Sequence, residues 1–158
     1  MKIYFASDHA GFELKEKVKE FVTTLGHEVE DFGAKTYIVG DDYPDYISQA
    51  AFAVSEDPEN SRAIIFGASG QGEAMCANRY KNVRASVYYG EPESGFFSKK
   101  GDVIALSREH NNANILSIGA RFVSFEQAKV AIKKWLIINF TNEERHARRL
   151  EKLEKLLK

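Results

Sequence analysis

Short runs that favour strands alternate with amphipathic stretches along the whole chain, in units of about 30 residues. The short runs contain β-branched and aromatic residues and are bounded by glycine or polar residues, which is typical of buried strands. The predicted strands lie at residues 2–7, 27–32, 62–66, 83–89 and 114–118.

Helical spacing of apolar residues connects these strands. Leu14, Val18, Phe21 and Leu25 recur on one face of a predicted helix, and Gly26 ends it. Further helices are predicted from an Asp45 cap to residue 54, over residues 73–79, and in the segment that ends near residue 110.

Two capping boxes predict helix starts near the end of the chain. Ser124 is followed by Gln127, and Thr141 by Glu144, at the spacing that satisfies the first helical N–H groups. The first of these helices is expected to run to about residue 139, and the second forms the end of the chain.

Alternating strands and helices predict a parallel sheet covered on both faces. Five strands within 158 residues fit a single domain, residues 1–158, with an α/β Rossmann-like, doubly wound architecture. The last residues are rich in Lys and Glu, yet Leu150, Leu153 and Leu157 fall on one stripe. This end is therefore predicted to be a helix that is solvated or extends to a partner subunit.

Composition and charge narrow the function classes. A net charge of −1 gives no global attraction to nucleic acid or to an anionic membrane. Cys76 is the only cysteine, which excludes an intrachain disulfide, and we interpret it as a small buried hydrophobe. Neither a signal peptide nor a membrane-length apolar run is found, so a cytoplasmic protein is expected.

The sequence GASGQG at residues 67–72 follows the third predicted strand. It is neither a Walker loop nor a dinucleotide fingerprint, because the lysine and the third glycine that these motifs need are missing. Two interpretations remain open. The segment is a tight turn, or it is an anion cradle in which Ser69 and the amides around Gly70 and Gly72 stabilise a developing oxyanion.

Glu73 follows this turn and also has two interpretations. An acid in the first turn of a helix is favoured by the helix dipole alone. Beside an oxyanion cradle, the same carboxylate is a candidate base for removing a proton next to a carbonyl. Burial would raise its pKa and the helix dipole would lower it, and the sequence does not decide between them.

Ligands bind open parallel sheets at the carboxyl ends of the strands. Asp8 and His9 end the first predicted strand, His110 and Asn111 precede the fifth, and Arg121 follows it. We expect all of them at this edge, with Asp8 and His9 facing His110 so that protons can be exchanged. The alternatives are an N-cap role for Asp8 and a structural role for each histidine.

Several basic side chains lie near the start of the last predicted helix, where the helix macrodipole disfavours positive charge. Arg145 and Arg149 lie four residues apart on one helical face, a spacing that suits a phosphate dianion. A nucleic-acid patch, which the net charge disfavours, and a solvated face are the alternatives. Phosphate binding is preferred, because local rule-breaking of this kind is expected at functional sites.

Several segments, taken together and in order, resemble one enzyme family. They are ASDHAGFELK, DDYPDY, GASGQGEAMCANR, SREHNNANIL, GAR and RHARR, and they are spread over nearly the whole chain. The chain resembles ribose-5-phosphate isomerase type B, whose wider family includes the galactose-6-phosphate isomerase subunits.

The resemblance implies aldose–ketose isomerisation of a sugar phosphate, in first place ribose 5-phosphate to ribulose 5-phosphate, without a metal or other cofactor. It implies that Glu73 removes the proton from carbon 2 and returns it to carbon 1 through a cis-enediolate. Ser69 and the amides around Gly70 would stabilise the enediolate oxygen. Asp8 and His110 would help to open the sugar ring.

The resemblance also implies a homodimer or a dimer of dimers with shared active sites. Four side chains would hold the phosphate, and two of them, Arg145 and Arg149, would reach across from a second subunit. The other two are His9 and Arg121, while Asn111, Tyr43 and His146 would lie near the sugar.

The chain departs from the family pattern in two places. One branch of the family has a cysteine base at the position of Gly67, whereas this chain matches the branch with glutamate after the turn. Residues 88–102, with Phe96 and Phe97, also form a longer connection than usual. Galactose 6-phosphate and allose 6-phosphate are therefore alternative substrates, and a non-catalytic phosphate-binding module on a flavodoxin-like fold is the alternative of another class.

Overall fold

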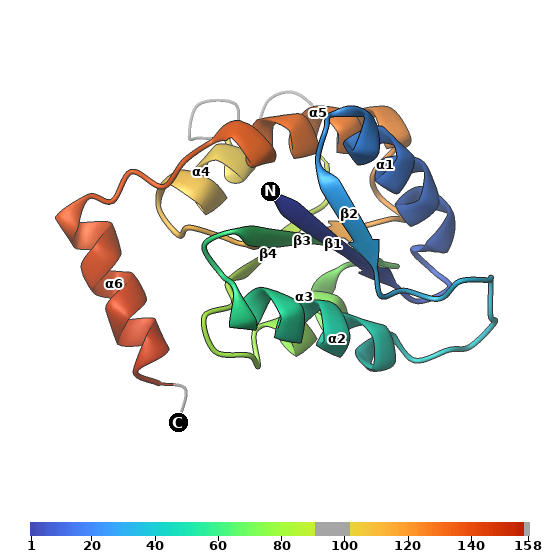
Figure 1. Ribbon diagram of the computed structural model, residues 1–158, viewed down its shortest axis with the longest axis horizontal. Coiled ribbons are helices and arrows are strands. Elements are labelled where there is room, and N and C mark those ends of the chain that lie inside the picture. Colours follow the sequence, from blue (N-terminus) through green and yellow to red (C-terminus); the bar gives the residue numbers. More distant parts are fainter. Residues whose placement is uncertain (91–101, 157–158) are drawn as a thin grey trace.

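The computed structural model describes residues 1–90 and 102–156, and in this part of the chain five strands form one parallel sheet (Figure 1). All five predicted strands are confirmed, with ends shifted by one or two residues at most. The order β2-β1-β3-β5-β4 reverses direction between β1 and β3, which is the switch point where such sheets bind ligands. The strands are β1 (Lys2–Ser7), β2 (Glu28–Asp31), β3 (Ser61–Gly67), β4 (Ala85–Tyr88) and β5 (Ile115–Gly119).

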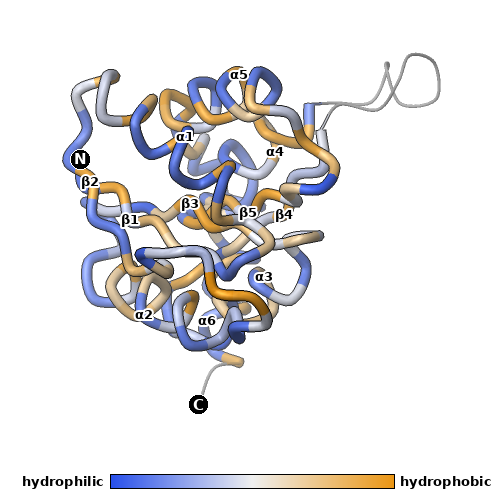
Figure 2. Tube along the Cα trace, turned by 90° about the vertical axis from the view of Figure 1, so that its right-hand side faces the viewer, coloured by the Kyte–Doolittle hydropathy of each residue, from blue (hydrophilic) through white to orange (hydrophobic). Residues whose placement is uncertain are grey.

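Helices cover both faces of the sheet, as the doubly wound prediction requires (Figures 1 and 2). One face packs against α1 (Phe12–Thr24), α4 (Val103–Glu109) and α5 (Phe125–Ile137). The other face packs against α2 (Tyr43–Glu56) and α3 (Gln71–Ala77). Alternate residues of β1 and β3 enter the two cores, so both faces of these strands are apolar and their sequences read as continuous apolar runs.

The last helix, α6 (Glu144–Glu154), stands apart from the two layers (Figure 1). Glu154 ties it to the start of β4, because its carboxylate pairs with the Arg84 guanidinium at 3.0 Å and accepts a hydrogen bond from the Asn82 amide at 3.1 Å. His146 is the buried residue of this helix, and its ring stacks on His110 with 4.1 Å between centroids. Most of α6 is therefore exposed in a single chain.

Of three predicted helix starts, two lie earlier in the structure and one is confirmed. The helix predicted from Asp45 begins at Tyr43, with Asp42 at the N-cap, because Pro44 needs no N–H partner in the first turn. The Ser124–Gln127 capping box is confirmed in both directions. The helix predicted from Glu73 begins at Gln71, so Glu73 is its third residue.

The Thr141–Glu144 capping box is wrong. The Thr141 hydroxyl donates to the carbonyl of Glu109 at 2.9 Å, and Glu143 occupies the N-cap of α6. Asn142, with φ of 52°, turns the chain between these two contacts. A tertiary partner thus replaces the local one.

Some sequence predictions fall on residues that the structure does not describe. Phe96 and Phe97 of the long connection and Leu157 of the terminal stripe are among them. Within residues 1–90 and 102–156, no helix combines the length and the apolar composition that a membrane crossing requires.

Candidate active site

The carboxyl ends of β1 and β3 bring Asp8 and the glycine turn to the same edge of the sheet. Ser7 is in register with Phe66, so Asp8, which follows β1, lies level with Gly67, the last residue of β3. A Cβ atom at Gly11 would lie 2.5 Å from the Cβ of Phe66, which shows how closely the turn after β1 approaches β3. These predicted site residues therefore do meet at the switch point.

Gly67 provides the space that the Glu73 carboxyl group occupies. A Cβ atom at position 67 would lie 2.6 Å from Oε2 of Glu73 and even closer to Oε1 and Cδ. Glu73 is only 4% exposed, so its carboxyl group lies against the backbone of the strand end rather than in solvent. No sequence motif indicates that the position of the Glu73 carboxyl group requires a glycine at position 67.

The pKa of Glu73 is raised above its ordinary value of 4.5. Burial is the main cause, and the negative charge of Asp8 adds to it, while a hydrogen bond from a backbone amide opposes both. A carboxylate with a raised pKa is a stronger base near neutral pH. Burial also raises the pKa of the half-buried Cys76 thiol, with Glu73 contributing, as expected for an unreactive cysteine.

The glycine turn is held from three sides. Gly70 adopts φ of 75°, which favours glycine, and its carbonyl accepts a hydrogen bond from Ser117 at 2.7 Å. Ser69 accepts a hydrogen bond from the Gln71 amide at 3.3 Å. Tyr43, at the start of α2, packs against Gly72, where an added Cβ would lie 2.9 Å from the tyrosine ring. The structure thus brings Ser69, Gly70, Gly72 and Tyr43 beside Glu73.

His9 contacts an acid, Asp41, that sequence reasoning missed. Asp8 is 7% exposed, and its Oδ1 accepts a hydrogen bond from the Ala10 amide at 2.9 Å. The Oδ1 atom of Asp41 lies 2.7 Å from Nδ1 of His9. Among the described residues, Asp8, His9 and Asp41 are the cluster whose donor atoms could hold a metal ion, all within 4.8 Å of one another. The direct His9–Asp41 hydrogen bond already uses one nitrogen and one oxygen of that donor set.

A polar cavity of about 370 Å³ lies next to this cluster. His9 and Arg121 both line it, which brings together two of the four side chains predicted for phosphate binding. Lys17 and Tyr37 also line it and were not predicted, because an exposed helical lysine and a residue in an irregular loop carry no motif.

The position expected for His110 and Asn111 within one chain is wrong. His110 is the C-cap residue of α4, and the following segment enters β5 at its amino end, where the Asn114 amide donates to the carbonyl of Arg84. In a parallel sheet the connection before a strand lies at the opposite edge from the connection after it. Five residues of β5 separate the two edges by about 16 Å.

The cations of α6 lie at this second edge together with His110. Arg145 is exposed and its Nε donates to the Glu143 carboxylate at 2.9 Å, while Arg149 is exposed. Burial, the neighbouring His110 and the Arg145 charge lower the pKa of His146 below its ordinary 6.5. The structure therefore groups His110, Asn111, Arg145, His146 and Arg149 near one another but away from Glu73 of the same chain.

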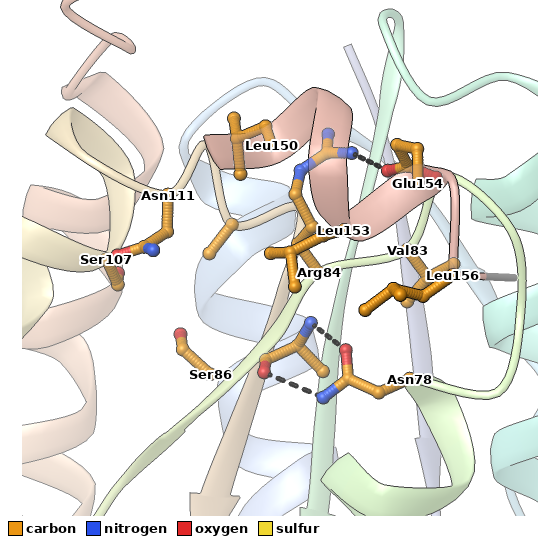
Figure 3. Close-up of a pocket in the computed structure, with 12 residues that line it drawn as sticks. Asn78, Val83, Arg84, Ser86, Ser107, Asn111, Leu150, Leu153, Glu154 and Leu156 are labelled. Carbon is orange, nitrogen blue, oxygen red and sulfur yellow. Dashed lines mark hydrogen bonds and ion pairs between the residues drawn. The ribbon is translucent and has the colours of Figure 1, made fainter. Parts of the chain in front are cut away.

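An apolar groove of about 430 Å³ runs between α6 and the amino edge of the sheet (Figure 3). Leu150 and Leu153, two members of the predicted leucine stripe, line it together with Leu156. Leu153 and Leu156 are 52% and 75% exposed. The opposite wall includes Val83, Ala85, Ala113 and Asn111.

A buried carboxyl group of raised pKa beside a glycine turn, at the switch point of a doubly wound sheet, is an arrangement that suits proton transfer on a small ligand. Comparison with known proteins identifies the class as the aldose–ketose isomerases. The family model described as Ribose/Galactose Isomerase matches residues 3–153. The chain belongs to this family and is a sugar-phosphate isomerase.

Relatives and solved structures match almost the full length of the chain. Ribose-5-phosphate isomerase B of Mycobacterium tuberculosis is 34% identical over 151 residues, covering 96% of this chain and 86% of the relative. The Escherichia coli protein of the same name is 36% identical, covering 95% and 92%. The structure of ribose-5-phosphate isomerase B from Mycoplasma genitalium with bound ribulose-5-phosphate has a TM-score of 0.87 at 32% identity, covering 98% and 95%.

Proposed function

We propose that this isomerase interconverts ribose 5-phosphate and ribulose 5-phosphate, with Glu73 as the base. The observation that carries the proposal is the buried Glu73 carboxyl group, packed on Gly67 with a raised pKa. The names of the relatives, ribose-5-phosphate isomerase B, support this pentose phosphate as the substrate. So does the Mycoplasma genitalium structure with ribulose-5-phosphate.

The reaction moves one proton from carbon 2 to carbon 1 and one from the carbon 2 oxygen to the carbon 1 oxygen. The Glu73 carboxylate removes the proton from carbon 2 of the open-chain aldose, and the electron pair of that C–H bond forms the double bond of a cis-enediolate. The Ser69 hydroxyl and the amides around Gly70 stabilise the negative oxygen. Glu73 then returns the proton to carbon 1, while the hydroxyl proton on the carbon 2 oxygen passes to the carbon 1 oxygen, which gives the ketose. Burial assists this chemistry, because the carboxyl group holds its proton more firmly than an exposed glutamate does.

Binding of the phosphate orients the sugar far from the reacting carbons. His9 and Arg121 line one cavity beside Asp8, so they are placed to hold a phosphate at the switch-point edge. This binding energy aligns carbon 2 with Glu73, and orientation of this kind accounts for much of the rate enhancement of enzymes.

The site needs residues from a second copy of the chain. His110, Asn111, Arg145, His146 and Arg149 lie at the opposite edge of the sheet from Glu73 within one chain. A two-fold dimer brings that edge of one protomer to the glycine turn of the other. The apolar groove and the exposed Leu153 and Leu156, at and just after the end of α6, support such an interface. In the dimer, Asp8 of one protomer and His110 of its partner open the sugar ring, with Asn111 beside them.

The test is turnover of ribose 5-phosphate, galactose 6-phosphate and allose 6-phosphate by the wild-type protein and by Glu73→Gln. We expect the highest kcat/KM for ribose 5-phosphate and loss of turnover in Glu73→Gln. The control is Glu126→Gln, an exposed acid in the first turn of α5, which should behave as wild type. Near-normal turnover by Glu73→Gln would eliminate it as the base, and a preference for either hexose phosphate would replace the proposed substrate.

A further inference from the structure

His9 is held by a carboxylate that the isomerase assignment does not use. Oδ1 of Asp41 accepts two hydrogen bonds from His9, one from the backbone amide at 2.8 Å and one from ring atom Nδ1 at 2.7 Å. The Asp41 side chain is 7% exposed and that of His9 is 28% exposed. A contact across 32 residues thus attaches the irregular segment before α2 to the end of β1.

The Asp41 carboxylate is built to stay ionised. Burial raises its pKa, but the hydrogen bonds from the His9 amide and ring, together with the Tyr46 hydroxyl, outweigh burial and lower it. An ionised carboxylate accepts hydrogen bonds and donates none. Nδ1 of His9 therefore keeps its proton in both the neutral and the cationic ring.

A fixed Nδ1 proton determines what the other ring nitrogen does. Nε2 is the nitrogen left to the ligand, and it donates a hydrogen bond when the ring is cationic. The Tyr37 ring meets His9 edge-on, with centroids 6.2 Å apart and planes at 88°. The imidazole is thus restrained by Asp41 through Nδ1 and by Tyr37 against its ring, beside the cavity that Arg121 also lines.

We propose that Asp41 is the positioning residue of His9, fixing its tautomer and ring orientation so that Nε2 is presented to the phosphate of the substrate. The inference rests on the proposed function in one respect, that His9 binds the phosphate. It assigns Asp41 no contact with the substrate. Partners that orient a histidine in this way affect ligand affinity through the histidine.

The first measurement is independent of catalysis. Long-range ¹H–¹⁵N spectra of the imidazoles, with His9 assigned through His9→Gln, report which nitrogen carries the proton in the neutral ring. We expect the Nδ1–H tautomer in wild type and a shift to the Nε2–H tautomer in Asp41→Ala. Asp45→Asn, which removes a nearby exposed charge from the first turn of α2, should leave the spectrum unchanged. An unchanged His9 tautomer in Asp41→Ala overturns the proposal.

The second measurement separates positioning from a general structural role. Inorganic phosphate is used as a competitive probe, so its affinity is obtained even for a poor substrate. We expect Asp41→Ala to weaken phosphate binding and raise KM about tenfold, with kcat changed less than about threefold. In the His9→Gln background the same substitution should add almost nothing, because its effect passes through His9. Additive effects overturn the proposal.

A second variant, Asp41→Asn, is tested in case Asp41→Ala does not fold. Asp41→Asn keeps the shape and one acceptor oxygen but removes the charge, so it should give mixed His9 tautomers and a smaller rise in KM. Wild-type tautomer and affinity in Asp41→Asn would contradict the need for a carboxylate. If no sugar phosphate is turned over, the substrate assignment fails, while the tautomer and phosphate measurements still judge Asp41.

Discussion

Replacing Gly67 by alanine places a methyl group where the Glu73 carboxyl group lies. The added Cβ would be 2.6 Å from Oε2, against 3.4–4 Å for an ordinary contact, so the carboxyl group must withdraw by about 1 Å or more. Gly67 does not have a positive φ, and the group that yields is the end of a flexible side chain. The substitution therefore displaces the proposed base without straining the backbone.

The magnitude follows from that displacement. A misplacement of about 1 Å at a reacting group can lower the rate about 100-fold, equal to about 2.7 kcal/mol of transition-state stabilisation. The free energy of unfolding should change by less than about 1 kcal/mol, because no buried apolar contact is lost and alanine restricts the unfolded chain.

The assay is steady-state turnover of ribose 5-phosphate, with urea unfolding of the same samples. Gly67→Ala should lower kcat at least about 100-fold while the unfolding midpoint stays near that of wild type. As a control, Gly67→Ala combined with Glu73→Gln should be no slower than Glu73→Gln alone, since both act on one carboxyl group. A Gly67→Ala protein with kcat within about threefold of wild type would refute this steric reasoning.

Two pH-dependent effects are also expected. Because the pKa of Glu73 is raised, the folded state binds the Glu73 proton more tightly than the unfolded state does, and stability is lost as pH rises above 4.5. In urea unfolding, Glu73→Gln should therefore be more stable than wild type at about pH 7.5. This gain should vanish below pH 4.5. The lowered pKa of His146 has the opposite sign, so α6 should exchange its amide hydrogens faster, after correction for intrinsic rates, as pH falls below 6.5. His146→Phe should remove that pH dependence, and equal α6 protection at pH 5 and pH 7.5 would contradict it.

The sequence predicted the strands well because burial on both faces leaves a strong signal. Alternate residues of β1 enter different cores, and the apolar run that results is bounded by polar residues. The Ser124–Gln127 box was also predictable, since its two hydrogen bonds are local. Thr141 was not, because its partner is the carbonyl of Glu109, 32 residues away.

The candidate site was predictable only in its parts. The glycine turn and Glu73 are adjacent in sequence, whereas the need for Gly67 arises from side-chain packing that no motif encodes. His110 was assigned to the wrong edge because it precedes β5 in the chain. The residues before a parallel strand lie at its amino end, opposite the edge at which the glycine turn follows β3. Asp41 was overlooked because an acid in an irregular segment is usually solvated.

The most direct test of the account measures ribose 5-phosphate turnover in mixtures of two inactive variants, Glu73→Gln and Arg145→Ala, after their subunits have exchanged. If the base comes from one protomer and the arginine from its partner, each mixed dimer contains one intact site. Random pairing of equal amounts should then restore about a quarter of wild-type activity. Mixed dimers, verified by differential tagging, that stay as inactive as the two parents would contradict a shared site with Glu73 as its base.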